Sequence, residues 1–310
     1  RLASMGIRIL REGADPASRY EGVGPDDVVI LPAFGVTVAE MEHLRAKGCV
    51  LVDTTCGSVL NVWKNVHQYA RDGFTAVIHG KHYHEETKAT ASQAASHTTG
   101  RYLVVRDRRE AEQVCSFIRG EIGAADLMSV LGKAASPGFD PDRDLQRVGL
   151  ANQTTMLMSE SLEIQELLRK AMSERYGDAD LASRFRAFDT ICSATQDRQD
   201  AVNAMLAEGG VDLMVVVGGY NSSNTQALAR ICAVRLPTYH IDAARCIEPG
   251  GIRHRPLGST AEEVRADWLP AGPVRIGLTA GASTPNNVVG DVVARILALR
   301  GLSPADLTAA

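Results

Sequence analysis

Short apolar runs alternate with longer amphipathic patterns along most of the chain, and this alternation limits the possible folds more than any other feature. The apolar runs are rich in Val, Ile and Leu and alternate little with polar residues, as expected of strands buried on both faces. Clear examples are DVVILPAF, CVLVDTT, FTAVIHG, DLMVVVGG and VRIGLTAG. Helical patterns such as VLNVWKNVHQYARDG and SLEIQELLRKAMSERYG lie between them. Repeated strand–helix units predict an α/β fold with mainly parallel sheets and covering helices.

Three further segments carry weaker signals. The apolar run LMSVLGK, residues 127–133, is expected to be another strand. Residues 134–146 contain Pro, Gly and Asp and are expected to form the most exposed loop. The polar segment HGKHYHEET, residues 79–87, is also expected to be a loop.

A tetrapeptide recurs at equivalent points of two of these units. The sequence DTTC, which ends at Cys56, returns as DTIC, which ends at Cys192. Each copy follows an apolar run and precedes a helical pattern. A thiol at the same point of two similar units can be one ligand of a shared site. The repeat therefore makes a cysteine-ligated metal or iron–sulfur site the leading hypothesis.

The other four cysteines carry no such signal. Cys49, Cys115 and Cys232 lie in apolar contexts and are expected to be small buried residues, whereas Cys246 is expected in a loop. The chain has a formal net charge of −4, and no basic run resembles a nucleic-acid footprint. No apolar stretch approaches the length of a membrane span, and no signal-peptide pattern opens the sequence. We expect a cytoplasmic protein with neither nucleic-acid nor membrane partners.

Several predicted strands end in Gly followed by short polar side chains. The segments concerned are HGKHYHEET, NQTT at residues 152–155, GGYNSSN at 218–224 and TAGASTPNN at 279–287. Ligands of open α/β sheets bind at the carboxyl ends of strands, where helix N-termini favour anions. One such cluster alone would be an ordinary helix N-cap. Four together favour an anionic ligand.

The segment HGKHYHEET allows two interpretations. One is a zinc site, because five potential ligands are crowded into it: His79, His82, His84, Glu85 and Glu86. The other assigns anion contacts to His84 and Lys81 and makes Glu86 a proton donor. No HExxH spacing is present, so the residues alone leave both interpretations open.

Six segments, in order, resemble the motifs of one known family. They are VDTTCGSVLNVW, HGKHYHEETKATAS, ANQTTM, DTICSATQDRQDA, GGYNSSNT and TAGASTPNNVV. The chain resembles the LytB family, the 4-hydroxy-3-methylbut-2-enyl diphosphate reductases, from about residue 25 to about residue 296. The forms HGK…HEETKATAS and LPAFG resemble the plant and cyanobacterial branch.

The resemblance implies three pseudo-equivalent α/β domains around a central four-iron four-sulfur cluster. In this chain the domains would be residues 1–56, the remainder of the first domain, then 57–189 and 190–296, with a C-terminal tail at 297–310. Each domain of the family gives one cysteine ligand, and one iron has no protein ligand. Cys56 and Cys192 match the second and third of these cysteines.

The resemblance also implies a reaction, the last step of the methylerythritol phosphate route to isoprenoids. Two electrons and two protons remove the allylic hydroxyl as water, which yields isopentenyl and dimethylallyl diphosphate. The electrons would come from a ferredoxin- or flavodoxin-type donor. Glu86 matches the residue that delivers protons, and Thr154 matches the residue that orients the hydroxyl. The diphosphate cradle is matched by His84, Ser222, Ser223, Asn224 and Ser283.

Two departures from the family pattern affect these expectations. A histidine of many bacterial members is Phe34 here, and His79, Lys81 or His82 is expected to supply its contact. The first cysteine of the family lies upstream of RLASMG, so we expect an incomplete first domain and no intact cluster in the chain as given. The hypotheses are therefore a complete reductase in its natural form, an inactive cluster-deficient fragment that binds a diphosphate, and a zinc hydrolase built on HGKHYHEE.

Overall fold

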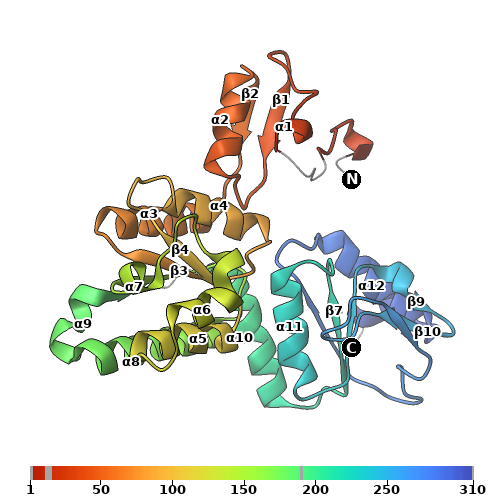
Figure 1. Cartoon of the computed structure of the whole chain (residues 1–310). Coiled ribbons are helices and arrows are strands. Elements are labelled where there is room, and N and C mark those ends of the chain that lie inside the picture. The colour runs from red at the N-terminus through yellow and green to blue at the C-terminus, as the bar shows by residue number, and fades with distance from the viewer. Residues whose placement is uncertain (1–2, 11–15, 189–190, 309–310) are drawn as a thin grey trace. The chain divides into compact units, whose positions relative to one another are not determined.

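A computed structural model describes residues 3–10, 16–188 and 191–308 of the chain. The chain forms two compact units, of which the first comprises residues 1–154 and 159–190 and the second 155–158 and 191–310. Within these described ranges three sheets are parallel and one small sheet is antiparallel, so the expected α/β class with mainly parallel sheets is confirmed (Figure 1). The finer division at residues 56, 189 and 296 stays a prediction, and Asp189 and Thr190 of the repeat lie outside the described residues.

The first unit begins with a parallel pair of strands, β1 (Val28–Leu31) and β2 (Val50–Asp53). A 3-10 turn (Ala3–Met5) and α1 (Pro16–Arg19) precede the pair, and α2 (Val38–Ala46) connects its strands. Thr37 caps α2 because its hydroxyl accepts from the Glu40 backbone, while the Glu40 carboxylate accepts from the Thr37 backbone. This capping box fixes where the helix begins.

The main sheet of the first unit has the strand order β4-β3-β5-β6. Its strands are β3 (Thr75–His79), β4 (Tyr102–Val105), β5 (Val148–Asn152) and β6 (Phe185–Ala187). The accompanying helices are α3 (Gly57–Arg71), α4 (Glu85–Ala94), α5 (Arg108–Arg119), α6 (Ala124–Leu131), α7 (Pro141–Asp144), α8 (Met158–Tyr176) and α9 (Asp178–Arg184), with a 3-10 turn at Gly132–Ala134. Val77 packs with α5, α6 and α8, whereas Ile78 packs with α3 and α4. Both faces of the sheet are thus covered, as its unbroken apolar runs predict.

The second unit is built on a parallel sheet with the order β12-β7-β8. Its strands are β7 (Leu213–Val217), β8 (Thr238–Ile241) and β12 (Ile276–Ala280), and its helices are α10 (Ser193–Glu208), α11 (Ser223–Ala233) and α12 (Asn286–Ala298). Short 3-10 helices lie at Ala244–Cys246 and Pro304–Thr308. Val216 packs with α10 and α11, while Val217 faces α12 and the antiparallel sheet. That small sheet contains β9 (Ile247–Glu248), β10 (Gly251–His254) and β11 (Glu263–Arg265).

Two local predictions were wrong. The run at residues 127–133 is not a strand, because Leu127 and Leu131 lie one helical turn apart in α6 and both enter the core. The segment HGKHYHEET is a loop only at residues 80–84, because His79 ends β3 and α4 begins at Glu85. In the first segment, the i, i+4 spacing of the apolar residues favours a helix over a strand. In the second, the Glu and Ala residues that follow His84 are good helix formers and favour a helix over a loop.

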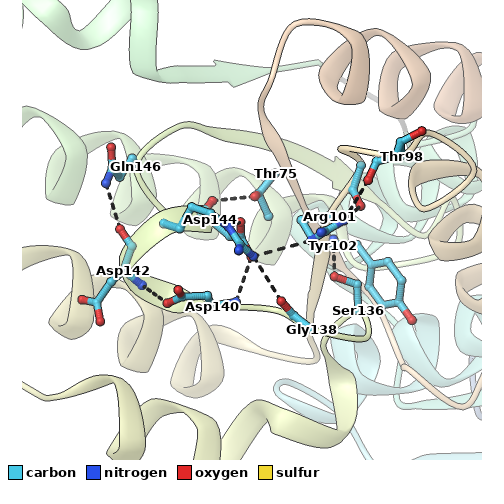
Figure 2. A network of polar contacts seen from close by, with 12 residues as sticks. Thr75, Thr98, Arg101, Tyr102, Ser136, Gly138, Asp140, Asp142, Asp144 and Gln146 are labelled. Carbon is cyan, nitrogen blue, oxygen red and sulfur yellow. Dashed lines mark hydrogen bonds and ion pairs between the residues drawn. The ribbon is translucent and has the colours of Figure 1, made fainter.

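The expected exposed loop at residues 134–146 is instead an ordered part of the first unit. Phe139 and Leu145 are buried, and Pro141 starts the short helix α7. Figure 2 shows the network that fastens this segment to the amino ends of the strands. The Asp144 carboxylate accepts from Arg143 at 2.7 and 2.8 Å and from the Asp140 backbone at 2.8 Å. Its backbone carbonyl accepts from the Thr75 hydroxyl.

Candidate functional site

The carboxyl ends of β3 and β5 bring three of the predicted site residues together. The two strands pair in parallel, so the loops that follow them lie side by side. His84 and Glu86 follow β3, and Thr154 follows β5. The backbone N–H of Thr154 donates to Glu86 Oε1 at 2.5 Å. The structure therefore links Glu86 and Thr154 directly.

Glu86 has the environment of a carboxylic acid that keeps its proton near neutrality. Its side chain lies in the first turn of α4 and the residue is only 3% exposed. Burial raises the pKa of Glu86 to about 7, although hydrogen bonds from the backbone and side chain of Thr154 counteract part of this rise. A carboxyl with such a pKa can donate a proton at physiological pH.

His84 is the N-cap residue of α4. Its Nδ1 accepts from the Glu86 backbone N–H at 3.2 Å, so Nε2 carries the ring proton in the neutral form. Burial lowers the pKa of His84, and the nearby Lys81 charge lowers it further. The Phe34 ring contacts His84 edge-on, with 6.3 Å between ring centroids. The imidazole is thus held with its Nε2–H available as a donor to an anion.

Gln153 is a further site residue that sequence reasoning did not single out. It is 1% exposed, and its Oε1 accepts from the Lys81 backbone and from the Thr87 hydroxyl, both at 3.1 Å. A Cβ at Gly80 would lie 2.9 Å from the Gln153 Cβ, so glycine is required for this approach. The amide therefore ties the loop after β3 to the loop after β5. The sequence feature that could have pointed to Gln153 is its place inside the NQTT segment at a strand end.

The three residues expected to replace the contact of the missing histidine have different surroundings. His79 is fully buried, and its Nδ1 contacts Ser161 Oγ at 2.8 Å, so its ring links β3 to α8. His82 is exposed and Lys81 is half-buried. A contact from Lys81 or His82 stays a prediction, whereas burial argues against His79.

The second unit places the expected cradle residues on two neighbouring strand ends. Ser222, Ser223 and Asn224 follow β7 and Ser283 follows β12, and these strands pair in parallel. Asn224 Oδ1 accepts from the Ala282 backbone at 2.8 Å, which joins the two loops. Asn224 is 1% exposed, and its buried Nδ2 has no partner within the described part of the chain. An orphaned donor at a helix N-terminus fits an anionic ligand.

Two glycines permit this close approach of the loops. A Cβ at Gly281 would lie 2.1 Å from Thr225 Oγ1, and one at Gly218 would lie 2.6 Å from the same atom. Thr225 is fully buried in the first turn of α11. Glycine at both loops therefore lets the start of α11 sit against the strand ends.

The repeated cysteines occupy the same local position in the two units. Cys56 is the N-cap of α3 with φ −65° and ψ 143°, and Cys192 is the N-cap of α10 with φ −73° and ψ 144°. Cys56 is exposed, and Cys192 is half-buried with its Sγ 2.9 Å from Thr195 Oγ1. Positive helix ends suit thiolate ligands. Each thiol therefore lies where a thiolate ligand is favoured, and a cluster shared by the two stays a prediction.

The other cysteines differ from this pair, since Cys49, Cys115, Cys232 and Cys246 are all buried. Burial of the first three is confirmed; Cys246 ends a 3-10 helix rather than lying in a loop. Among the described residues, no three His, Cys, Asp or Glu side chains gather as a metal site. The zinc interpretation of residues 79–86 therefore has no support among the residues that the structure describes. No described helix is long and apolar enough to cross a membrane.

Comparison with known proteins agrees with the motifs. The family model described as "LytB protein" matches residues 1–297. The 4-hydroxy-3-methylbut-2-enyl diphosphate reductase of Gloeobacter violaceus is 50% identical over 314 residues, covering 100% of this chain and 74% of that protein. The reductase of the same name from Synechococcus sp. strain RCC307 is 51% identical over 282 residues, covering 90% of this chain and 68% of that protein.

A solved structure supports the fold. The E-1-hydroxy-2-methyl-but-2-enyl-4-diphosphate reductase of Plasmodium falciparum matches with a TM-score of 0.63 and 20% identity, covering 90% of this chain and 69% of that chain. At this identity the likeness concerns the fold alone.

The family model covers nearly the whole chain, and cyanobacterial relatives are about half identical to it in sequence. This chain is therefore a member of the LytB family.

Proposed function

We propose that the protein is a 4-hydroxy-3-methylbut-2-enyl diphosphate reductase, an oxidoreductase of isoprenoid biosynthesis. The C–O bond of the allylic hydroxyl breaks, and the hydroxyl leaves as water. Two electrons and two protons are consumed, one proton entering the water and the other the allyl carbon. The products are isopentenyl and dimethylallyl diphosphate. The observation that carries this proposal is the buried Glu86 carboxyl, hydrogen-bonded to Thr154, in a chain that matches the family over residues 1–297.

Glu86 is the proposed proton donor. Its carboxyl is held by the Thr154 backbone N–H at Oε1, and the protonated carboxyl would donate to the hydroxyl of the substrate. With a pKa of about 7, a large fraction of Glu86 is protonated at neutral pH. Thr154 orients both the carboxyl and, through its hydroxyl, the substrate.

The diphosphate is proposed to bind to the loops after β7 and β12 and to His84. Asn224 Nδ2 and the hydroxyls of Ser222, Ser223 and Ser283 would donate to its oxygens. The buried orphaned Nδ2 of Asn224 supports this assignment. His84 Nε2–H adds a donor from the N-cap of α4, the helix that carries Glu86.

Cys56 and Cys192 are the proposed protein ligands of the family's four-iron four-sulfur cluster. When bound, such a cluster supplies single electrons and an open iron that acts as a Lewis acid. A ferredoxin- or flavodoxin-type protein is the proposed electron donor. The proposed location is the cytoplasm, since thiolate ligands must stay reduced.

The test is an anaerobic assay of the cluster-loaded, full-length protein with the synthetic allylic alcohol diphosphate and a chemical reductant. Two isomeric C5 diphosphates should form, with two electrons consumed per molecule. A protein with an intact cluster that leaves the substrate unchanged would contradict the proposal. Saturable diphosphate binding without turnover would instead favour the non-catalytic alternative.

A further inference from the structure

The loop between β7 and α11 is held by a side chain that precedes the cradle residues. Tyr220 lies between Gly219 and Asn221, two residues before Ser222. Its hydroxyl donates to Glu262 Oε1 at 2.6 Å. Its backbone carbonyl accepts from Gln226 Nε2 at 2.6 Å. The middle of the loop is therefore fixed through both side chain and backbone.

The Tyr220 ring is held on its surfaces as well. The Arg255 guanidinium carbon lies 4.1 Å from the ring centroid, which is cation–π geometry. His240 contacts the ring edge-on, with 5.0 Å between ring centroids. The same imidazole donates through Nε2 to the Gly218 carbonyl at 2.9 Å, and His240 is 4% exposed. One buried histidine thus contacts the loop at two points.

Two of the groups that hold Tyr220 directly adjoin strands of the antiparallel sheet. Glu262 immediately precedes β11, and Arg255 immediately follows β10. The Arg255 backbone N–H donates to the His240 carbonyl at 2.9 Å, which connects this sheet to β8. Arg253 of β10 forms an ion pair with Glu262 at 3.8 Å. The contacts of Tyr220 therefore lead from the cradle loop to the antiparallel sheet.

We propose that Tyr220 is a positioning residue for the diphosphate cradle and that the antiparallel sheet is its anchor. This inference rests on the proposed function, which assigns Ser222 and Asn224 to the diphosphate. Gly218, with φ 151°, and Gly219 give the loop a backbone freedom that other residues lack. Anchoring Tyr220 removes that freedom before binding, so the loop loses little entropy when the diphosphate arrives.

The first measurement compares KM and kcat in the cluster-loaded, full-length enzyme. Tyr220→Leu removes the hydroxyl and the ring contacts. We expect KM to rise about tenfold, since ordering one or two loop residues on binding corresponds to a factor of this size. We expect kcat to stay within about twofold, because Glu86 and Thr154 are untouched. Tyr220→Phe keeps the ring between Arg255 and His240 and should raise KM only about threefold.

Tyr176 offers a matched control. The Arg184 guanidinium carbon lies 4.1 Å from the Tyr176 ring, which is the distance found for Arg255 and Tyr220. Tyr176 ends α8 in the other unit and belongs to no cradle loop. Tyr176→Leu should leave KM unchanged. Equal rises in KM for both leucine variants would contradict a positioning role.

Binding of inorganic pyrophosphate, measured by calorimetry, separates this inference from the proposed function. Weaker binding to Tyr220→Leu supports the anchor even if the wild-type protein reduces no substrate. Unchanged binding overturns the anchor even if turnover is normal. If Tyr220→Leu does not fold, Glu262→Ala removes the hydrogen-bond acceptor outside the loop. It should weaken pyrophosphate binding about threefold, and unchanged binding in that variant would likewise overturn the proposal.

Discussion

Glu86 combines near-complete burial with hydrogen bonds from Thr154 alone among the causes that shift its pKa, and this combination sets its chemistry. A carboxyl that water could reach would lose its proton near pH 4. At 3% exposure the charged form is penalised, and the pKa rises to about 7. Both turnover and stability should therefore depend on the protonation of this side chain.

Glu86→Gln should lower turnover by about a hundred- to ten-thousandfold, because an amide keeps the shape and loses the transferable proton. Cluster content and substrate affinity should stay close to those of the wild type. Glu85→Gln is the matched control, since Glu85 is the neighbouring residue and pairs with Lys88 on the surface. Single-turnover kinetics with both variants measure the effect. Near-normal turnover of Glu86→Gln would remove Glu86 from the mechanism.

The raised pKa of Glu86 also predicts how stability depends on pH. Its folded pKa of about 7 lies above the unfolded value of 4.5, so the folded state binds more protons between these limits. The contribution of Glu86 protonation to the free energy of unfolding is about 3 kcal/mol in all. It is fully present below about pH 4.5 and is lost as pH rises through about 7. Denaturant unfolding from pH 5 to 8 should show a steeper decline for the wild type than for Glu86→Gln. Parallel curves would contradict the assigned pKa.

At the scale of elements, ordered loops fix the edges of the sheets. Residues 134–146 reach the amino ends of the strands through Asp144 (Figure 2). The loops after β7 and β12 meet at Gly281 and Asn224. The first arrangement depends on the side chain of Asp144, and the second depends on Gly281 having no side chain. Each can therefore be tested by a single substitution.

Asp144→Asn should destabilise the first unit by about 1–3 kcal/mol, because charge-assisted hydrogen bonds are lost from a buried site. Burial alone would raise the pKa of Asp144, but bonds from Arg143 and the Asp140 backbone lower it below its usual value. Its contribution is therefore present above about pH 4 and is lost as pH falls through the lowered pKa. Asp142→Asn, an exposed neighbour, is the control. Equal acid unfolding of the two variants would contradict this role.

Gly281→Ala should destabilise the second unit by about 1–3 kcal/mol and weaken pyrophosphate binding, since the new methyl would meet Thr225 Oγ1. Gly290→Ala is the control, because a Cβ there meets nothing within 4 Å and lies inside α12. It should be neutral or stabilise by up to about 1 kcal/mol. Denaturant unfolding and calorimetry measure both effects. Tight pyrophosphate binding by Gly281→Ala would show that the cradle tolerates the methyl group.

At the scale of the whole molecule, the repeated cysteines are expected to share one cluster. Cys56→Ser and Cys192→Ser should each remove most of the bound iron and sulfide, because thiolates hold such clusters. Cys115→Ala, a buried cysteine in α5, should keep both. Iron and sulfide analysis of anaerobically purified full-length protein gives the result. In the loaded protein the two sulfurs should lie within about 7 Å of each other, and a wider separation would contradict a shared cluster.

The sequence alone determined the strand–helix alternation, the parallel sheets and the family, because apolar period and motif order are local properties of a chain. It also placed Cys56 and Cys192 at equivalent points, and both proved to be helix N-caps. It misassigned residues 127–133, since a short apolar run suits a buried helix as well as a strand. It gave no sign of β9–β11, whose strands are two to four residues long.

Only the tertiary structure decided which polar residues act together. The pKa of Glu86 depends on burial and on Thr154, which lies 68 residues further along the chain. The anchoring of Tyr220 depends on Glu262, 42 residues away. Such contacts arise where neighbouring strands end at one edge of a sheet, and the order of strands is not written in any local pattern. The motifs therefore indicate which residues form the site, whereas burial and hydrogen bonding between distant segments set the chemistry of those residues.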